Sequence, residues 1–414
     1  MPRSGLLQAM LGTRSLVSLS LGLGLLADAS PAGQEEAPRL RTPLSNGAAV
    51  FVEAMSKAKT VSVQLIAAAR GCEETPATSG LRHLLEHLLV KGRGKDLDYR
   101  LESQGMFLSA ETFRDFTKIE VACAPDKLGV ALSALSELLA PPEIGAEEIA
   151  REARIMAEEA ALHDAPRRLS AELWSRAFGP IGADPSGSLE VVAAATPEAL
   201  RALHARHFRA SNLVLAIAGP VSVDAATREA RKVLEGLPKS ETGAWAPREP
   251  SDGGSLAVQN ALGEARAAVA PGISEPRTAW LLAAALAIAG ELPAAFVTYT
   301  PSIRPGLVIV GRAASDGRLS RLLQSFRASD ETRLFEAGKS LARRWVRAQT
   351  DRPSDSGLLH GSLMAQAFGA RPDSILQNVD AMTRDQFRSA LRELSGAEPP
   401  GPADSGSRGG GGSR

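Results

Sequence analysis

The chain has 414 residues, of which 44% are hydrophobic and 23% are charged, and its formal net charge is zero. These proportions are those of an ordinary globular protein, and the length is enough for two or three domains. The balanced charge argues against a nucleic-acid partner, because proteins that bind nucleic acid usually carry a basic excess.

The first 29 residues are typical of an export signal. Arg3 and Arg14 supply positive charge, residues 15–26 are apolar, and Ala27-Asp28-Ala29 fits a small-x-small cleavage pattern. The apolar stretch is shorter than the roughly 20 residues that a membrane span requires. We therefore expect residues 1–29 to be a signal peptide, with an uncleaved anchor as the alternative. The mature chain is then periplasmic or secreted in a bacterium and has no membrane span.

Residues 30–42 are rich in Pro, Glu and Arg and predict a flexible lead-in to a first unit over residues 43–240. In this unit, period-two alternation predicts strands, and helical periodicity predicts helices between them. We expect strands at 49–52, 61–67, 106–112, 117–124 and 212–218, and helices at 80–90, 125–139, 146–163, 169–178, 196–207 and 222–237.

A linker over residues 241–254 and a second unit over residues 255–397 are predicted next. The second unit repeats the order of elements in shortened form. A strand from residue 257, an apolar helix at 278–289 and strands at 295–299 and 307–310 precede a mainly helical segment. Residues 398–414, rich in Gly and Ser, predict a disordered tail. The fold class is therefore α+β, with two similar lobes, each a sheet flanked by helices, and the second shortened.

The two cysteines, Cys72 and Cys123, both fall near strand-like segments. Export permits a disulfide between them, and two buried free thiols are at least as compatible with the pattern.

The motif with the clearest chemistry is His83-Leu84-Leu85-Glu86-His87 on the helix at 80–90. Two histidines four residues apart point the same way on a helix, and Glu86 shares that face. Such a pair can bind one Zn²⁺, and the glutamate can take a proton from a water molecule that the ion activates. Two histidines on a helix can also simply hydrogen-bond, so the interpretation depends on a third ligand.

The helix at 146–163 supplies two candidates for that ligand. Glu152 and Glu159 are seven residues apart and lie on its apolar stripe, where an unpaired carboxylate is costly. Geometry alone allows either one to bind the metal with the other behind it, and the alternative is that both are solvated.

These segments resemble, in order, those of the insulinase/pitrilysin family of zinc metallopeptidases (family M16), in its bacterial processing-peptidase-like branch. The run at 79–92 resembles the catalytic helix, residues 101–112 with Asp115-Phe116-Thr117 resemble the glycine turn and active-site edge strand, and residues 152–159 resemble the E-R-x-V-I-x-x-E helix. The resemblance covers residues 45–240 and is weaker beyond. It implies one zinc ion per chain, bound by His83, His87 and Glu159, with Glu86 as general base and Glu152 as an outer carboxylate.

The resemblance also implies a two-lobed fold that forms half of a chamber for unfolded peptides. An extended substrate is expected to pair with the edge strand through five residues: Phe107, Leu108, Ser109, Ala110 and Glu111. Ser109 stands where the family usually has Asn, which shortens the reach of any side-chain hydrogen bond.

The second lobe departs further from the family pattern. Active members supply an Arg and a Tyr there, which polarise the scissile carbonyl. In this chain Phe296 stands where the Tyr is expected, and Tyr299 is better explained as an ordinary strand residue. The sequence therefore predicts an exported zinc metalloendopeptidase that acts as a homodimer or with a family partner. The alternative is a non-catalytic or weakly active subunit that binds peptides or completes a heterodimeric peptidase. The other histidines, His163, His204, His207 and His360, are expected to be structural or on the surface.

Overall fold

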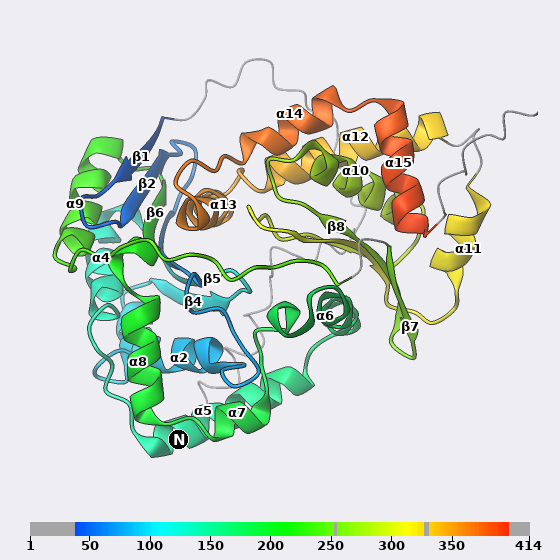
Figure 1. Ribbon diagram of the computed structural model, residues 1–414. Coiled ribbons are helices and arrows are strands. Elements are labelled where there is room, and N and C mark those ends of the chain that lie inside the picture. The colour runs from blue at the N-terminus through cyan, green and yellow to red at the C-terminus, as the bar shows by residue number, and fades with distance from the viewer. Residues whose placement is uncertain (1–37, 252–254, 327–330, 397–414) are drawn as a thin grey trace, which may run out of the picture.

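The computed structural model of the chain describes residues 38–251, 255–326 and 331–396. These residues form two β-sheets with helices packed around them (Figure 1). The expected signal peptide and C-terminal tail lie outside the described residues. Within the described part of the chain, the helices are too short or too polar for any of them to cross a membrane.

The first sheet has six strands in the order β1-β2-β6-β3-β5-β4. Only the β2–β6 pair is parallel, and β4 is an edge strand that pairs with β5. The strands are β1 Arg39–Pro43, β2 Ala49–Ala54, β3 Val61–Ala68, β4 Phe107–Thr112, β5 Phe116–Cys123 and β6 Leu213–Gly219.

Strand β1 corrects one expectation, because residues 39–42 of the predicted flexible lead-in belong to it. Arg39 donates to the Glu53 carboxylate at 2.7 Å, and Arg41 donates to the Ala370 carbonyl at 2.8 Å. The short, charged segment does not look like a buried strand, but charged side chains are common on edge strands of this kind.

Most helices of the first unit contact this sheet or pack on the helices that do, and leucine-rich surfaces fill the space between. Sequence periodicity did not predict α3 and α7, which are only six and five residues long. The helices are α2 Leu81–Leu89, α3 Leu97–Glu102, α4 Leu128–Glu137, α5 Ala146–Ala161, α6 Ala165–Phe178, α7 Leu189–Ala193, α8 Pro197–His207 and α9 Val223–Glu235.

The second sheet has four antiparallel strands in the order β7-β8-β10-β9. The α+β class and the smaller second sheet are as expected, although the strand predicted from residue 257 is a hairpin. The elements are β7 Leu256–Asn260, β8 Gly263–Ala270, α10 Pro276–Gly290, β9 Ala295–Thr298, β10 Gly306–Arg312, α11 Arg318–Ser325, α12 Glu331–Ala348, α13 Pro353–Gln366, α14 Asp373–Ala381 and α15 Arg384–Ser395.

The two units exchange one helix each (Figure 1). Helix α13, from the second unit, packs on β3 and β6 of the first sheet. Helix α6, from the first unit, packs on the second sheet, where Trp174 and Phe178 join a cluster with Phe296 and Ile309. Each sheet is therefore covered in part by the other unit, which ties the two units together through apolar burial.

Cys72 and Cys123 are free and buried. The register pairs Cys123 with Val61, at the start of β3, whereas Cys72 follows the end of β3. The eight residues of β3 lie between these two positions. Since a strand rises about 3.3 Å per residue, the thiols are too far apart for a disulfide.

Candidate metal centre

Helix α2 presents the motif residues toward α5. It begins after Gly80, whose φ of 89° and contacts exclude a side chain: a Cβ there would lie 2.7 Å from Val192 Cγ2. Leu84 and Leu85 are fully buried in the core beneath the helix. Because this apolar side faces the core and α5 packs against α2, His83 and His87 meet the acidic side of α5.

Three ligand atoms from these helices form a small triangle. The Nε2 atoms of His83 and His87 are 3.1 Å apart, and Glu159 Oε2 lies 3.7 Å and 3.4 Å from them. A tetrahedral Zn²⁺ ion with bonds of about 2.0–2.1 Å separates its ligand atoms by about 3.4 Å. The residues present therefore fit a zinc ion, and two nitrogens with one carboxylate oxygen are a donor set that zinc favours.

Glu152 lies behind this triangle. Its Oε2 is 3.5 Å from His87 Nδ1, on the side of the ring away from Glu159, and the residue is 1% exposed. Its other oxygen lies 3.3 Å from Lys91 Nζ. A carboxylate at the second ring nitrogen orients a metal-binding histidine and selects its tautomer.

The electrostatics of the two histidines differ sharply. Burial, reinforced by the neighbouring His87 cation, lowers the pKa of His83 to about 3. Burial acts to lower the pKa of His87 as well, but Glu152 and Glu159 outweigh it and raise the pKa to about 10. Without metal at neutral pH, His83 is therefore neutral and His87 carries an additional proton and a positive charge. Zinc binding at neutral pH must release that proton.

Glu86 sits beside the triangle and is 6% exposed. Its carboxylate and the two histidines form a group whose ligand atoms lie within 4.8 Å of one another. Burial raises the pKa of Glu86 to about 7, although the Thr112 hydroxyl donates to its Oε2 at 2.8 Å. A carboxyl group that titrates near neutral pH is suited to exchange protons in catalysis. Sequence reasoning did not single out Thr112, which ends the predicted edge strand.

Strand β4 borders α2 and carries the five residues expected to bind substrate. Leu108 is buried in the core, whereas Phe107 is 47% exposed, and the other three, Ser109, Ala110 and Glu111, are partly exposed. The structure therefore brings the His83-Glu86-His87 motif and this edge strand together.

The two aromatic residues that the sequence analysis singled out in the second unit, Phe296 and Tyr299, lie in cores. Tyr299 is 3% exposed, packs against Trp345 with ring centroids 6.0 Å apart, and has a pKa that burial raises. Phe296 belongs to the cluster under α6. Residues 291–294 alone connect α10 to β9, whereas the first unit places α3 between α2 and β4.

The remaining histidines lie outside the ligand triangle. His163 Nε2 lies 3.4 Å from Ser186 Oγ, next to the metal centre's α5 helix. His204 and His207 are buried at the end of α8, and His360 stacks on Phe51 with ring centroids 4.8 Å apart.

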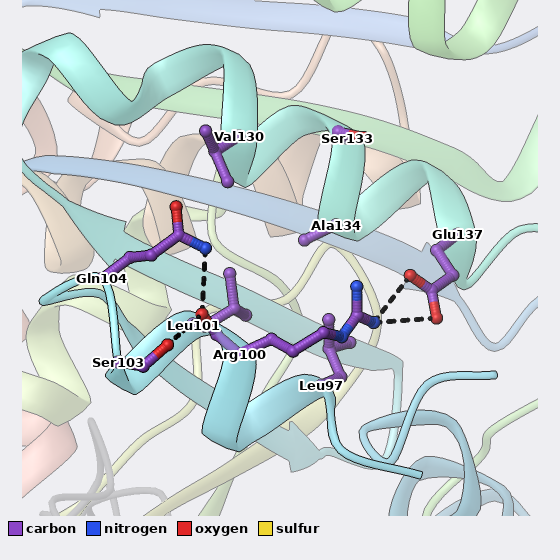
Figure 2. A pocket seen from close by; sticks show the side chains of 9 residues that line it. All are labelled: Leu97, Arg100, Leu101, Ser103, Gln104, Val130, Ser133, Ala134 and Glu137. Carbon is purple, nitrogen blue, oxygen red and sulfur yellow. Dashed lines mark hydrogen bonds and ion pairs between the residues drawn. The ribbon is translucent and has the colours of Figure 1, made fainter. Parts of the chain in front are cut away.

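A shallow pocket between α3 and α4 lies apart from these residues (Figure 2). Arg100 forms an ion pair with Glu137 at 2.9 Å, and Gln104 donates to the Arg100 carbonyl at 3.0 Å. None of the residues lining this pocket belongs to the candidate centre.

Residues 49–179 match the model of insulinase (peptidase family M16), and residues 194–289 match the model of the M16 inactive domain. The two matches together cover more than half of the chain. The chain belongs to peptidase family M16. This membership agrees with the resemblance of the α2, β4 and α5 segments to those of the family. At the level of the family, the chain is similar to zinc proteases.

Two relatives in sequence carry the names of peptidases. An uncharacterized zinc protease of Streptomyces coelicolor is 27% identical over 203 residues, which are 47% of this chain and 44% of that protein. A probable mitochondrial-processing peptidase subunit beta of Arabidopsis thaliana is 28% identical over 217 residues, 50% of this chain and 40% of that one. The chain spans about half the length of the curated relatives it matches.

Solved structures share the fold over most of the chain. A protease from Helicobacter pylori has a TM-score of 0.70 at 16% identity, and the match covers 87% of this chain and 97% of that one. The first half of a periplasmic protease from Escherichia coli has a TM-score of 0.61 at 17% identity, with coverage of 88% and 91%. At these identities the likeness concerns the fold.

Proposed function

We propose that the chain is an exported zinc metalloendopeptidase that hydrolyses peptide bonds of unfolded peptides. The observation that carries the proposal is the triangle of His83, His87 and Glu159 ligand atoms, 3.1–3.7 Å apart, with the buried Glu86 carboxyl beside it. Three protein ligands leave one position of a tetrahedral ion for water or substrate, as catalytic zinc requires.

A Zn²⁺ ion held by His83, His87 and Glu159 would supply a Lewis acid for the scissile carbonyl and would lower the pKa of a water molecule toward about 7. Glu86 acts as the general base and then donates its proton to the departing amine nitrogen. Thr112 holds Glu86 Oε2, which leaves Oε1 to exchange the proton. Glu152 orients His87 through its Nδ1 atom.

The substrate is proposed to extend the first sheet at its β4 edge. The backbone groups of residues 107–111 pair with an extended peptide, which places a peptide bond next to α2. An unfolded segment meets this requirement because its backbone is not already paired in secondary structure. Sequence preference then depends on the side chains that alternate along β4, where Phe107 is the most exposed of the five.

The burial of the aromatic residues in the second unit favours a second candidate function. Phe296 and Tyr299 are buried, and the connection between α10 and β9 is only residues 291–294. A chain that lacks its own carbonyl-polarising groups requires a partner that supplies them. Under this alternative the chain is a weakly active or non-catalytic subunit of a heterodimeric peptidase, or binds peptides, and the relative named as a subunit beta supports it.

Export is proposed from the signal-like residues 1–29. A periplasmic protease among the structural neighbours supports this location.

The test is to purify the protein alone and together with a family M16 partner from the same genome. Bound zinc is measured by mass spectrometry, and cleavage of an unfolded peptide is compared with that by Glu86→Gln. We expect one zinc per chain in both proteins and at least about a hundredfold lower activity in the variant. Absence of zinc from the wild type contradicts the proposal. Zinc with activity only in the mixture supports the divided enzyme.

A further inference from the structure

We propose that His207 is a positioning residue for Glu86 and acts through two threonines. The inference rests on the proposed function of Glu86 as the general base. It concerns a histidine on α8, remote in the chain from α2, that the mechanism above leaves unused.

Four buried side chains form a continuous line of hydrogen-bonding groups. Thr112 Oγ1 lies 2.8 Å from Glu86 Oε2 and 3.5 Å from Thr117 Oγ1, and His207 Nε2 lies 3.1 Å from Thr117 Oγ1. The exposed fractions of the four residues are between 1% and 9%. The two threonines are directly opposite each other in the β4–β5 pairing, so the sheet register itself sets their approach.

The Glu86 carboxylate at one end of this line sets the direction in which each group donates its hydrogen bond. An ionised carboxylate only accepts, so Thr112 donates its hydroxyl proton to Glu86. The Thr112 oxygen can then accept from Thr117, whose oxygen in turn accepts from His207 Nε2–H. Burial lowers the pKa of His207 well below its ordinary value, which keeps the ring neutral. We assign the ring proton to Nε2, the tautomer in which His207 donates to Thr117. In that tautomer the neutral ring anchors both hydroxyl rotors, and the last one points at Glu86.

His207 restricts the rotation of the two threonine hydroxyls, which a hydrophobic residue at the same position would not do. Thr112 by itself could rotate its hydroxyl toward other acceptors and leave the Glu86 carboxyl free to turn. A donor at His207 removes that freedom at Thr117, and the cross-strand contact passes the constraint to Thr112. Glu86 thus keeps Oε2 bound and presents Oε1 in one orientation, which is what a general base requires.

His204 offers a matched control on the same helix. It is also buried, at 4% exposed, and its ring stacks on Phe208 with centroids 5.1 Å apart. Its Nε2 atom pairs with the Leu138 carbonyl at 3.0 Å and lies outside the line to Glu86. Replacing His204 therefore reports what loss of a buried α8 histidine does to folding alone.

The experiment compares His207→Leu, His207→Gln and His204→Leu in the full chain loaded with zinc, with its partner if activity requires one. We expect His207→Leu to lower kcat about tenfold while KM and bound zinc stay unchanged. His207→Gln carries an amide N–H that can replace the ring donor, and it should restore kcat to within about threefold of the wild type. His204→Leu should leave kcat unchanged at temperatures where it is folded.

Thr117→Val provides a second variant if His207→Leu does not fold. It removes one oxygen at nearly constant volume and should lower kcat to the same extent. A kcat for His207→Leu and Thr117→Val equal to that of His204→Leu would overturn the inference and leave the proposed function intact. A zinc-loaded wild type that cleaves no peptide, alone or with a partner, and that matches Glu86→Gln overturns both.

Discussion

Helices α2 and α10 occupy the same place in the two units. Each follows a long central strand, β3 or β8, and each precedes a strand that joins the sheet two places away, in the orders β3-β5-β4 and β8-β10-β9. Yet α2 carries His83, Glu86 and His87, whereas α10 has no histidine or carboxylate and is apolar and buried over most of its length. The fold does not need a polar helix at this position. The buried polar face of α2, which is costly, is therefore best explained by chemistry.

The β4–β5 turn of the first unit contacts the β9–β10 loop of the second unit. Asp115, in the β4–β5 turn, accepts from Arg248 at 2.7 and 2.9 Å and from Arg304, in the β9–β10 loop, at 3.1 Å. The three residues are buried, and the Arg248 guanidinium lies over Trp174 of the exchanged helix α6. Equivalent turns of the two units thus form one ionic clamp, so the apolar second unit still fixes the end of the strand pair that borders α2.

The largest expected effect tests whether zinc explains the difference between α2 and α10. Glu159→Gln removes the carboxylate whose oxygen completes the ligand triangle. We expect bound zinc to fall to near zero and cleavage to fall at least about a thousandfold. The control is Glu158→Gln, the adjacent exposed residue, which should retain both. Full zinc in Glu159→Gln would mean that the third ligand lies elsewhere.

The clamp between the units predicts the next effect. Asp115→Asn removes the carboxylate that two buried guanidinium groups share and should lower the free energy of unfolding at pH 7 by about 3–5 kcal/mol. The exposed Asp126→Asn should change it by less than about 0.5 kcal/mol. Urea denaturation of both variants measures this difference. A loss below about 1 kcal/mol would show that the exchanged helices alone hold the units together.

The same clamp predicts a pH dependence. Burial acts to raise the pKa of Asp115, but Arg248 and Arg304 outweigh it and hold the pKa below its ordinary value. A carboxyl group with a lowered folded pKa stabilises the protein above its unfolded pKa of about 3.9 and loses that contribution as the pH falls further. The difference between wild type and Asp115→Asn should therefore shrink below about pH 4.

The helices that carry the candidate site could be predicted from the sequence. The histidine spacing on α2 and the acidic positions on the α5 stripe are local patterns, and they predicted both helices and the faces that meet in the structure. The helix exchange could not be predicted, because the apolar pattern of α13 shows that it is buried but not on which sheet. The line from Glu86 to His207 joins four elements, α2, β4, β5 and α8, that only the tertiary fold brings together. Strand β1 lacks the apolar alternation of a buried strand.

A smaller effect is expected at Glu152, which touches the centre only through His87. Glu152→Gln should weaken zinc binding by about 10–100-fold, because His87 loses the carboxylate at Nδ1. Excess zinc should restore its activity, whereas Glu159→Gln should stay inactive under the same titration. If Glu152→Gln behaves like Glu159→Gln, Glu152 itself binds the metal, the possibility that stripe geometry alone left open.

The smallest effect is predicted for a substitution in the second unit, at Tyr299. Tyr299 is the tyrosine nearest in sequence to the position at which active family members polarise the carbonyl, but its side chain is buried against Trp345. Tyr299→Phe keeps that packing and removes only the hydroxyl, so kcat/KM should stay within about twofold of the wild type. A hundredfold loss with unchanged stability would mean that the second unit opens to bring Tyr299 to the substrate. The chain would then hold a complete active site, and a partner would not be needed for carbonyl polarisation.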